Sequence, residues 1–586
     1  MKINKVLLLF LALQGAVAAS GQGLTLPFFD DFSTTRLTPS VARWVAGSGV
    51  YVNNTMTTNH PSVNVGTFDG LRPDGLPYVL NDENAEGGTD TLTSLPINLA
   101  GLTPASNVFL SFYWQRRGLG EQPDATDSLV LEFKGTNNQW RQVWGRAGDV
   151  VNTNFAIQVS PVSDSQYFTA NFQFRFRSRG RQSGMFDSWH IDYIYLNKNR
   201  TATYRPLRDR ALVQPVTPLL RRYTAMPLRQ FLARPAQELA DTVRSDFRNL
   251  DVNFIPINSR FTVRDDLTGQ VLQQDTLPNP INALGLARYA LPFRLRLPAV
   301  AATPARAVFR TTYSLITKDE TSPDVPELNL TLNDTLSGLT VLDDYYAYDD
   351  GSAETAKQIN QRLARVAVRF VTNRPDAVRA VRINIAASRR DQRGQPILVA
   401  IYGNNNGLPA DRPLVQQSFP IAYANTRNGF VEFVFDQPVN VPDSVFYVAY
   451  SQLDDPAIPV GFDRNSPFRN LIFVNLGTRW DRLTDQDGVL LIRPVMAGGP
   501  VVLTATEPDV PALLFPNPTT GPIQWGGALL ESRHLDVLTP AGQVVLALPL
   551  APGQTAASLG TLPTGLYLLR FMTAAGTPRT LKVLVR

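Results

Sequence analysis

The stretch NFQFRFRS, residues 171–178, places a phenylalanine at every second position and polar residues between them. In an extended chain, Phe172, Phe174 and Phe176 point to one side, and the polar side chains point to the other. A period of two is typical of a strand that buries one face of a sheet. The stretch therefore predicts a β-sandwich or barrel around these phenylalanines.

The same alternation recurs along the chain. The segments VFLSFYW (108–114), SLVLEF (128–133), FVEFVFDQPV (430–439) and SVFYVAYSQ (444–452) are expected strands. The segment FDSWHIDYIYLN, which closes the first module at residues 186–197, is expected to place four aromatic or aliphatic side chains on one face. They are Trp189, Ile191, Tyr193 and Tyr195.

The chain of 586 residues is too long for one core, and its 44 prolines and 39 glycines favour short strands joined by turns. We therefore predict an all-β protein of several β-sandwich domains in series. The expected parts are a signal peptide (1–21), a jelly-roll β-sandwich (22–199), an immunoglobulin-like β-sandwich (200–342), a second jelly-roll-like β-sandwich (343–499), a linker (500–512) and a small C-terminal β-sandwich (513–586). In the second domain, PAQELADTVRSDF (235–247) is the expected short helix.

Composition excludes several classes of site. With no cysteine, the chain has no disulfide, no thiolate metal site and no cysteine nucleophile. The net charge of +5 is scattered, mostly as arginine, so a nucleic-acid partner is not expected. Beyond the first residues, no apolar run is long enough for a transmembrane helix in the mature chain.

The N-terminus reads MKINKVLLLFLALQGAVAASGQ. Lys2 and Lys5 precede an apolar run at residues 6–13, which is too short to span a bilayer. Small residues follow, and cleavage after Ala18 fits the A-x-A rule, with Ala19 and Gly21 as alternatives. The segment predicts export of the chain.

The segments PFFDDF (27–32) and DSWHIDYIYL (187–196) resemble the ends of jelly-roll modules in extracellular proteins, such as MAM-like and lectin-like domains. The resemblance implies a structural calcium near the acidic residues at these ends; no other cofactor is assigned. The candidate ligands are Asp30, Asp31, Asp187 and Asp192; a second set is Asp349, Asp350 and Glu354. The alternative interpretation is that these carboxylates cap turns or face water.

Trp114 and Trp189 are the candidate ligand-binding residues, because an exposed indole can stack on a sugar or a peptide. Aromatic residues of a sandwich more often fill its core, and that alternative stays open.

The segment LFPNPTTG, residues 514–521, marks a hard boundary, and strand-like segments with turn glycines follow it to the C-terminus. Residues 513–586 resemble the type A C-terminal sorting domain of the type IX secretion system. The matching residues are Pro516, Asn517, Pro518, Gly521, Gly565, Tyr567 and Lys582. The segment before the turn at Gly542 lacks the Asp or Asn that the family often has there.

This resemblance implies a route and two partners. The chain crosses the periplasm, the outer-membrane translocon recognises the sorting domain, and a surface sortase removes it. The mature protein is then extracellular or held on the outer cell surface. We expect cleavage between Gly499 and Leu514, where a flexible linker joins the last domain.

No residue is assigned a catalytic role. The three histidines lie in no HExxH motif, and no GxSxG elbow, P-loop or dinucleotide fingerprint is present. Three hypotheses follow: a non-catalytic surface protein that binds glycan or protein in adhesion, a structural component of the cell surface, and a glycan hydrolase on a jelly-roll scaffold. A hydrolytic carboxylate pair leaves no local sequence signature.

Overall fold

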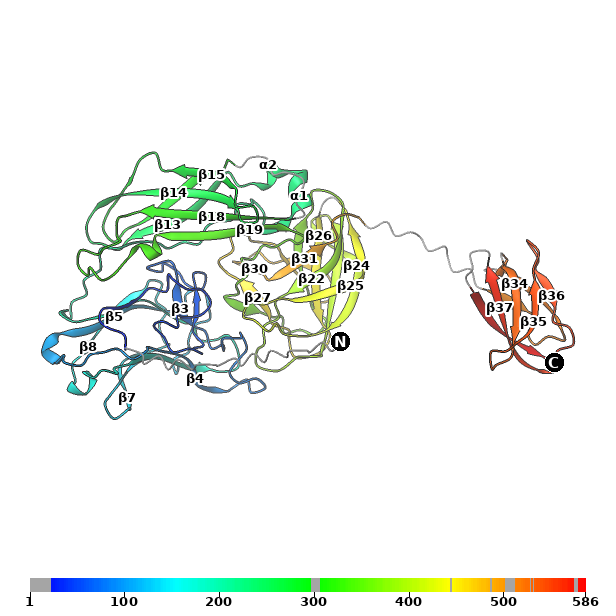
Figure 1. Ribbon diagram of the computed structural model, residues 1–586, viewed down its shortest axis with the longest axis horizontal. Coiled ribbons are helices and arrows are strands. Elements are labelled where there is room, and N and C mark those ends of the chain that lie inside the picture. The colour runs from blue at the N-terminus through cyan, green and yellow to red at the C-terminus, as the bar shows by residue number, and fades with distance from the viewer. Residues whose placement is uncertain are drawn as a thin grey trace, which may run out of the picture. The chain divides into compact units, whose positions relative to one another are not determined.

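The computed structural model describes residues 23–296, 306–442, 445–484, 487–500, 512–526, 529–530, 532–573 and 578–586. The expected signal peptide, including Ala18, and residues 501–511 of the expected linker lie outside the described residues. The chain forms two compact units that divide between residues 501 and 502. Nearly all regular structure is β, as predicted; Figure 1 shows the strands of the first unit from blue to yellow.

The first sandwich packs a six-stranded sheet against a four-stranded sheet. The six-stranded sheet has the order β2-β3-β10-β5-β8, with β1 also paired to β10, and the other sheet has the order β4-β9-β6-β7. Phe172, Phe174 and Phe176 are fully buried between the sheets, as their alternation predicts. The strands are β1 (Phe28–Asp30), β2 (Tyr51–Asn53), β3 (Val65–Phe68), β4 (Glu86–Thr93), β5 (Val108–Arg116), β6 (Ser128–Lys134), β7 (Trp140–Ala147), β8 (Ala156–Val162), β9 (Phe174–Arg181) and β10 (Trp189–Asn197), with short 3-10 turns η1 (Pro104–Ser106) and η2 (Ser165–Tyr167).

One expectation for β10 is wrong. The pairing register of β10 with β5 shifts between Asp192 and Tyr195, and Tyr193 adopts a positive φ of 55°. Such a bulge moves the following side chains to the opposite face. Trp189 and Ile191 therefore lie in the core of the first sandwich, whereas Tyr193 and Tyr195 belong to a separate apolar cluster. That cluster also includes Leu207, Leu250, Leu328 and Leu330, so it joins the first sandwich to the second.

The second sandwich packs a sheet of order β11-β13-β17 against a sheet of order β12-β19-β18-β14-β15, in which β16 also pairs with β14. The hairpin between β14 and β15 turns at Gly269, which has a φ of 75°. The strands are β11 (Arg210–Leu212), β12 (Ala225–Pro227), β13 (Thr242–Asn249), β14 (Ile255–Asp265), β15 (Val271–Thr276), β16 (Ile281–Ala283), β17 (Arg288–Arg294), β18 (Ala307–Ile316) and β19 (Thr335–Asp343), with the short helices α1 (Leu228–Ala233), α2 (Pro235–Glu238) and η3 (Thr331–Asn333).

The helix expected at residues 235–247 is only partly present. It ends after one turn as α2, and the remainder forms the strand β13. Val243, Ser245 and Phe247 are buried at every second position of β13. Burial of this face against the sheet outweighs the local helix preference of the preceding residues.

The third sandwich contains sheets of order β24-β23-β26-β21-β28-β29, β25-β22-β31 and β20-β27-β30. A register shift in β22 between Val378 and Ala380 keeps Val378, Val381 and Ile383 fully buried. The strands are β20 (Thr355–Lys357), β21 (Arg365–Val371), β22 (Asp376–Ile383), β23 (Pro396–Asn405), β24 (Leu408–Pro420), β25 (Val431–Val441), β26 (Val445–Gln452), β27 (Val460–Asp463), β28 (Ile472–Asn475), β29 (Trp480–Arg482), β30 (Val489–Leu490) and β31 (Ile492–Met496).

The C-terminal unit is a small sandwich of its own. A sheet of order β32-β33-β36 packs against a sheet of order β35-β34-β37-β38 around Ile523, Leu535, Val537 and Phe571. The strands are β32 (Leu513–Phe515), β33 (Pro522–Gly526), β34 (Ser532–Leu538), β35 (Val544–Pro549), β36 (Ala556–Ser558), β37 (Gly565–Thr573) and β38 (Pro578–Val585).

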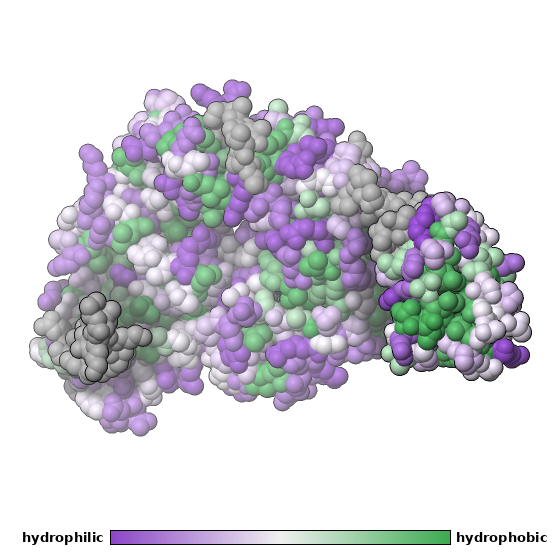
Figure 2. Space-filling view, turned by 45° about the vertical axis from the view of Figure 1, so that its right-hand side comes forward, coloured by the Kyte–Doolittle hydropathy of each residue, from purple (hydrophilic) through white to green (hydrophobic). Residues whose placement is uncertain are grey.

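The surface mixes polar and apolar areas, and Figure 2 shows a larger apolar area on the C-terminal unit. Exposed apolar residues of this unit include Leu566 and Leu584, which lie opposite each other in the pairing of β37 with β38. No helix among the described residues is long and apolar enough to cross a membrane.

Candidate functional site

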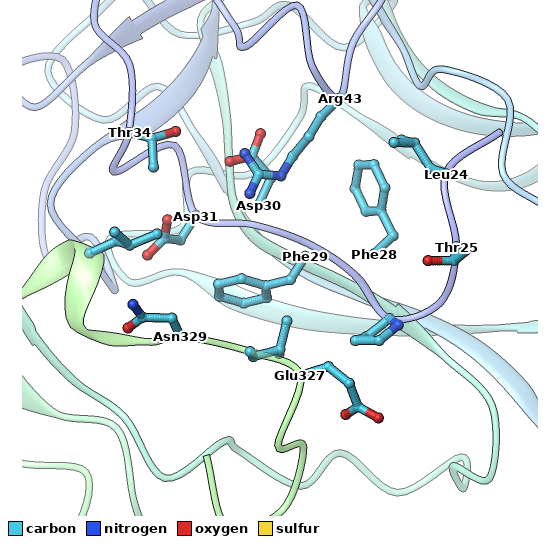
Figure 3. A pocket seen from close by; sticks show the side chains of 13 residues that line it. Leu24, Thr25, Phe28, Phe29, Asp30, Asp31, Thr34, Arg43, Glu327 and Asn329 are labelled. Atoms are coloured by element: carbon cyan, nitrogen blue, oxygen red, sulfur yellow. The ribbon is translucent and has the colours of Figure 1, made fainter. Parts of the chain in front are cut away.

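A cavity of about 340 Å³ lies beside β1, where the first sandwich meets the segment 327–332 of the second. Its volume is within the range of small-molecule sites. The lining combines aromatic, aliphatic and charged side chains, and in Figure 3 Arg43 extends toward Asp30 while Phe29 faces the segment that carries Asn329. The lining residues are Leu24, Thr25, Pro27, Phe28, Phe29, Asp30, Asp31, Thr34, Arg43, Glu327, Leu328, Asn329 and Leu332.

The carboxylate of Asp30 accepts hydrogen bonds from two residues of the first sandwich. Its Oδ1 accepts a hydrogen bond from the backbone N of Phe32 at 3.1 Å, and its Oδ2 accepts one from Nε1 of Trp44 at 2.5 Å. Burial raises the pKa of Asp30 to about 6, and the charge of Arg43 opposes that rise. With both oxygens engaged, Asp30 positions β1 against the core.

Asp31 and Asp192 lie on either side of Ser62. The Oγ of Ser62 is 3.1 Å from the backbone O of Asp31 and 3.0 Å from Oδ2 of Asp192. Asp192 is fully buried, and this burial, reinforced by the charge of Asp31, raises its pKa well above the usual value. Two of the four predicted calcium ligands are therefore close neighbours.

Asp187 lies in a different group. Its carboxylate, with those of Asp124 and Asp127, contributes oxygens that all lie within 4.8 Å of one another. Burial raises the pKa of Asp127 to about 7 and of Asp187 to about 6, and the charge of Asp187 adds to the rise for Asp127. The backbone N of Arg181 donates to Oδ2 of Asp187 at 2.7 Å. The four predicted ligands thus do not form one site.

Asp124 and Asp127 are not among the ligands predicted from the sequence. Their spacing of three residues in a turn brings both carboxylates together, and the backbone N of Asp124 donates to Oδ2 of Asp127 at 2.5 Å. Asp187 comes from a segment about sixty residues away, which no local pattern links to this turn. Three carboxylates with all-oxygen ligands can hold a hard cation if water completes the shell, or they can share protons.

In the second predicted acidic set, Asp350 and Glu354 lie together, since Oγ of Ser352 is 2.6 Å from Oδ1 of Asp350 and 3.1 Å from Oε1 of Glu354. Asp349 forms an ion pair with Arg493, so its charge is already compensated. Glu354 instead lies near Asp463, and burial with this like charge raises the pKa of Glu354 well above the usual value. Oε2 of Glu354 accepts a hydrogen bond from the backbone N of Arg464 at 2.8 Å.

The structure does not support a ligand-binding role for Trp114 and Trp189. Both rings are buried in the core, with Trp189 0% exposed and Trp114 6% exposed. The guanidinium of Arg116 lies 5.0 Å from the ring centroid of Trp114 and 5.5 Å from that of Trp189. Neither indole presents a face to which a sugar could bind, since the sandwich uses both for packing.

His190 is fully buried between two hydrogen-bond partners. Its Nδ1 lies 2.9 Å from Oγ1 of Thr67, and its Nε2 lies 3.1 Å from the backbone O of Arg117. Burial lowers the pKa of His190 to about 4. A neutral imidazole with both nitrogens engaged has a structural role.

The residues of the predicted sorting motif lie between β32 and β33 and within β37 and β38 of the C-terminal unit. Asn517 donates from Nδ2 to the backbone O of Lys582 at 2.9 Å and accepts at Oδ1 from the backbone N of Leu584 at 2.9 Å. The motif therefore fastens the segment before β33 to the last strand, β38. Pro516 and Pro518 flank Asn517.

Two further motif residues shape turns of this unit. Gly521 has a φ of 128°, and a Cβ there would lie 3.0 Å from the backbone O of Gly560, so the position favours glycine. Tyr567 is buried and donates through its hydroxyl to the backbone O of Pro563 at 3.0 Å. Gly565 begins β37 and pairs with Val585.

Comparisons with known proteins give solved structures only, because no family model and no curated protein matches the chain. A Bacteroides uniformis beta-glucuronidase 2 is 12% identical, with 48% of this chain and 30% of that chain covered at a TM-score of 0.20. A putative beta-galactosidase from Bacteroides fragilis is 10% identical, with 54% and 42% covered at 0.20. A Parabacteroides merdae beta-glucuronidase is 10% identical, with 56% and 37% covered at 0.22. This chain spans less than half of each of these proteins, and at these TM-scores no activity follows for it.

Proposed function

We propose that this protein is exported by the type IX secretion system and acts at the cell surface or outside it as a non-catalytic binding protein for a glycan or another protein. The observation that supports export is the contact of Asn517 with Lys582 and Leu584. These hydrogen bonds connect residues of the predicted motif within a compact unit that is separate from the first. A unit of this kind can be recognised and removed without opening the sandwiches before it.

The binding role rests on the cavity beside β1. It combines the aromatic ring of Phe29 with the charged groups of Arg43 and Glu327, which suits a ligand that has both apolar faces and hydroxyl or charged groups. Asp30 and Asp31 also line it, but their carboxylates are tied to Trp44 and Ser33 by hydrogen bonds. This arrangement favours binding over hydrolysis.

A glycan array and a panel of surface proteins, probed with the mature protein, test this role. We expect at least one ligand, and Arg43→Gln should weaken its binding about tenfold, because it removes the arginine charge from the cavity wall. The matched control is Arg72→Gln, which changes an exposed arginine outside this wall. No ligand on either panel, or equal affinities of the two variants, would favour the structural-component hypothesis.

A further inference from the structure

The bulge in β10 brings Tyr193 to the second sandwich. Its hydroxyl donates to Oδ2 of Asp209 at 2.7 Å, and Asp209 directly precedes β11. Asp209 is 0% exposed. A carboxylate of the second sandwich is thus buried against a strand of the first.

Asn333, the last residue of η3, lies between two carboxylates from different sandwiches. Its Nδ2 is 3.0 Å from Oδ2 of Asp31 and 2.9 Å from Oδ2 of Asp209. Asn333 is also 0% exposed. The other oxygens, Oδ1 of Asn333 and Oδ1 of Asp209, have no hydrogen-bond partner in the part of the chain that the structure describes. Buried oxygens without a donor are costly, and they indicate a missing partner.

The negative charge around Asn333 is not balanced by the protein. Within the described ranges, Asp31, Asp192, Asp209 and Asp334 form no ion pair, although each is at most 5% exposed. Arg210 follows Asp209, but its guanidinium binds Asp251 at 3.2 Å and Asp319 at 2.9 Å. Burial of several unpaired carboxylates is strongly unfavourable unless protons or a cation neutralise them.

A third buried oxygen lies in this group. Oδ1 of Asp334, the residue after Asn333, also has no hydrogen-bond partner among the described residues. One cation contacts several oxygens at once, which suits a group of this kind.

We propose that Asp31, Asp209 and Asn333 bind a divalent cation, most suitably calcium, between the first and second sandwiches. All three side chains offer oxygen, which hard cations prefer. A half-turn of the Asn333 amide places its Oδ1 where Nδ2 now lies, facing both carboxylates. Asp192 and Asp334 add negative charge around this group.

The cavity beside β1 gives this site an entry path, because Asp31 lines the cavity and also contacts Asn333. Calcium takes six to eight oxygens, so second carboxylate oxygens and water from the cavity complete the shell. The site differs from the acidic group of Asp124, Asp127 and Asp187, and it does not rest on the proposed surface function.

Terbium luminescence of the mature full chain tests the site directly. Tb³⁺ is a calcium probe whose emission is sensitised by a nearby aromatic ring, and Tyr193 is bonded to Asp209. We expect sensitised emission that calcium displaces. Asp209→Asn should abolish it, while the matched control Asp127→Asn, in the other acidic group, should retain it. No sensitised emission from the wild-type chain, or full emission from Asp209→Asn, would overturn the proposal.

Thermal unfolding gives a second readout that remains valid if Asp209→Asn folds poorly. Calcium at about a hundredfold over its Kd should raise the transition of the first unit in the wild-type chain by about 2–3 °C, relative to a chelator. Asp209→Asn, whose amide carries no buried charge, should fold without calcium and show no calcium-dependent rise. An unchanged wild-type transition would contradict a cation site.

Discussion

Arg427 of the third sandwich forms an ion pair with Asp69 of the first, and both side chains are buried, 8% and 1% exposed. The same guanidinium donates to the backbone oxygens of Gly49, Leu71 and Arg72 at 3.2, 3.1 and 2.9 Å. One arginine therefore satisfies several buried acceptors of a different sandwich, and it holds the two sandwiches together.

Loss of this arginine should destabilise the first unit. Arg427→Met removes the cation and leaves the carboxylate of Asp69 buried without its ion-pair partner, so we expect the free energy of unfolding to fall by about 3–5 kcal/mol. Denaturant unfolding followed by tryptophan fluorescence measures the change. Arg72→Met is the control, because Arg72 pairs with Asp74 at the surface and its loss should cost at most about 1 kcal/mol. Similar decreases in the free energy of unfolding of both variants would mean that Arg427 does not hold the two sandwiches together.

The pH dependence of stability should follow the acidic group of Asp127 and Asp187. Their folded pKa values of about 7 and about 6 lie above the ordinary value of 3.8, so the folded state binds more protons between these limits. The free energy of unfolding should therefore fall as pH rises from about 4 to about 7. Asp127→Asn should flatten this slope in chelator-treated protein, whereas Asp411→Asn, an exposed change on β24, should not. A slope of the opposite sign in this window would exclude the raised pKa values.

We expect Trp189 to contribute to the stability of the first sandwich and not to ligand binding. Trp189→Ala deletes a fully buried indole from the core of the first sandwich and should cost about 3–5 kcal/mol. Trp140→Ala, which removes a partly exposed ring beside Arg175, should cost clearly less. Calorimetry gives both values. If the folded Trp189→Ala variant lost ligand binding while its stability stayed unchanged, the indole would be a binding residue after all.

Asn517 should stabilise only the C-terminal unit. Asn517→Ala removes two hydrogen bonds to β38, and we expect a loss of about 1–2 kcal/mol, seen as faster hydrogen exchange at the amide of Leu584. Amides of the first unit should exchange at unchanged rates. Unaltered exchange at Leu584 would show that the motif does not fasten the last strand.

Alternation alone predicts much of this fold. Two predicted strands, Val108 to Trp114 and Ser128 to Phe133, form most of β5 and β6, because each strand has one face in the core. The face that Tyr193 and Tyr195 occupy could not be predicted, since a one-residue bulge reverses the faces without breaking the apolar pattern.

The full set of residues in the proposed cation site could not be predicted from the sequence either. Asp31 and Asp192 are recognisable at the two ends of the first module, but Asp209 and Asn333 come from the second sandwich, where neither lies in a metal-binding pattern. Only the packing of the two sandwiches brings these side chains together. The sequence left both placements of Trp189 open for a related reason, because no local pattern distinguishes an indole in a core from one on a surface; the structure places it in the core.

Export of this protein with removal of its C-terminal unit should leave a new C-terminus in the mature chain, which can be measured. The full chain is expressed in a bacterium with an active type IX secretion system, and the surface and medium fractions are analysed by mass spectrometry of C-terminal peptides. We expect a C-terminus between Gly499 and Leu514 in these fractions, and none in a strain without the translocon. An intact chain ending at Arg586 outside the cell, or the same processed chain without the translocon, would contradict it.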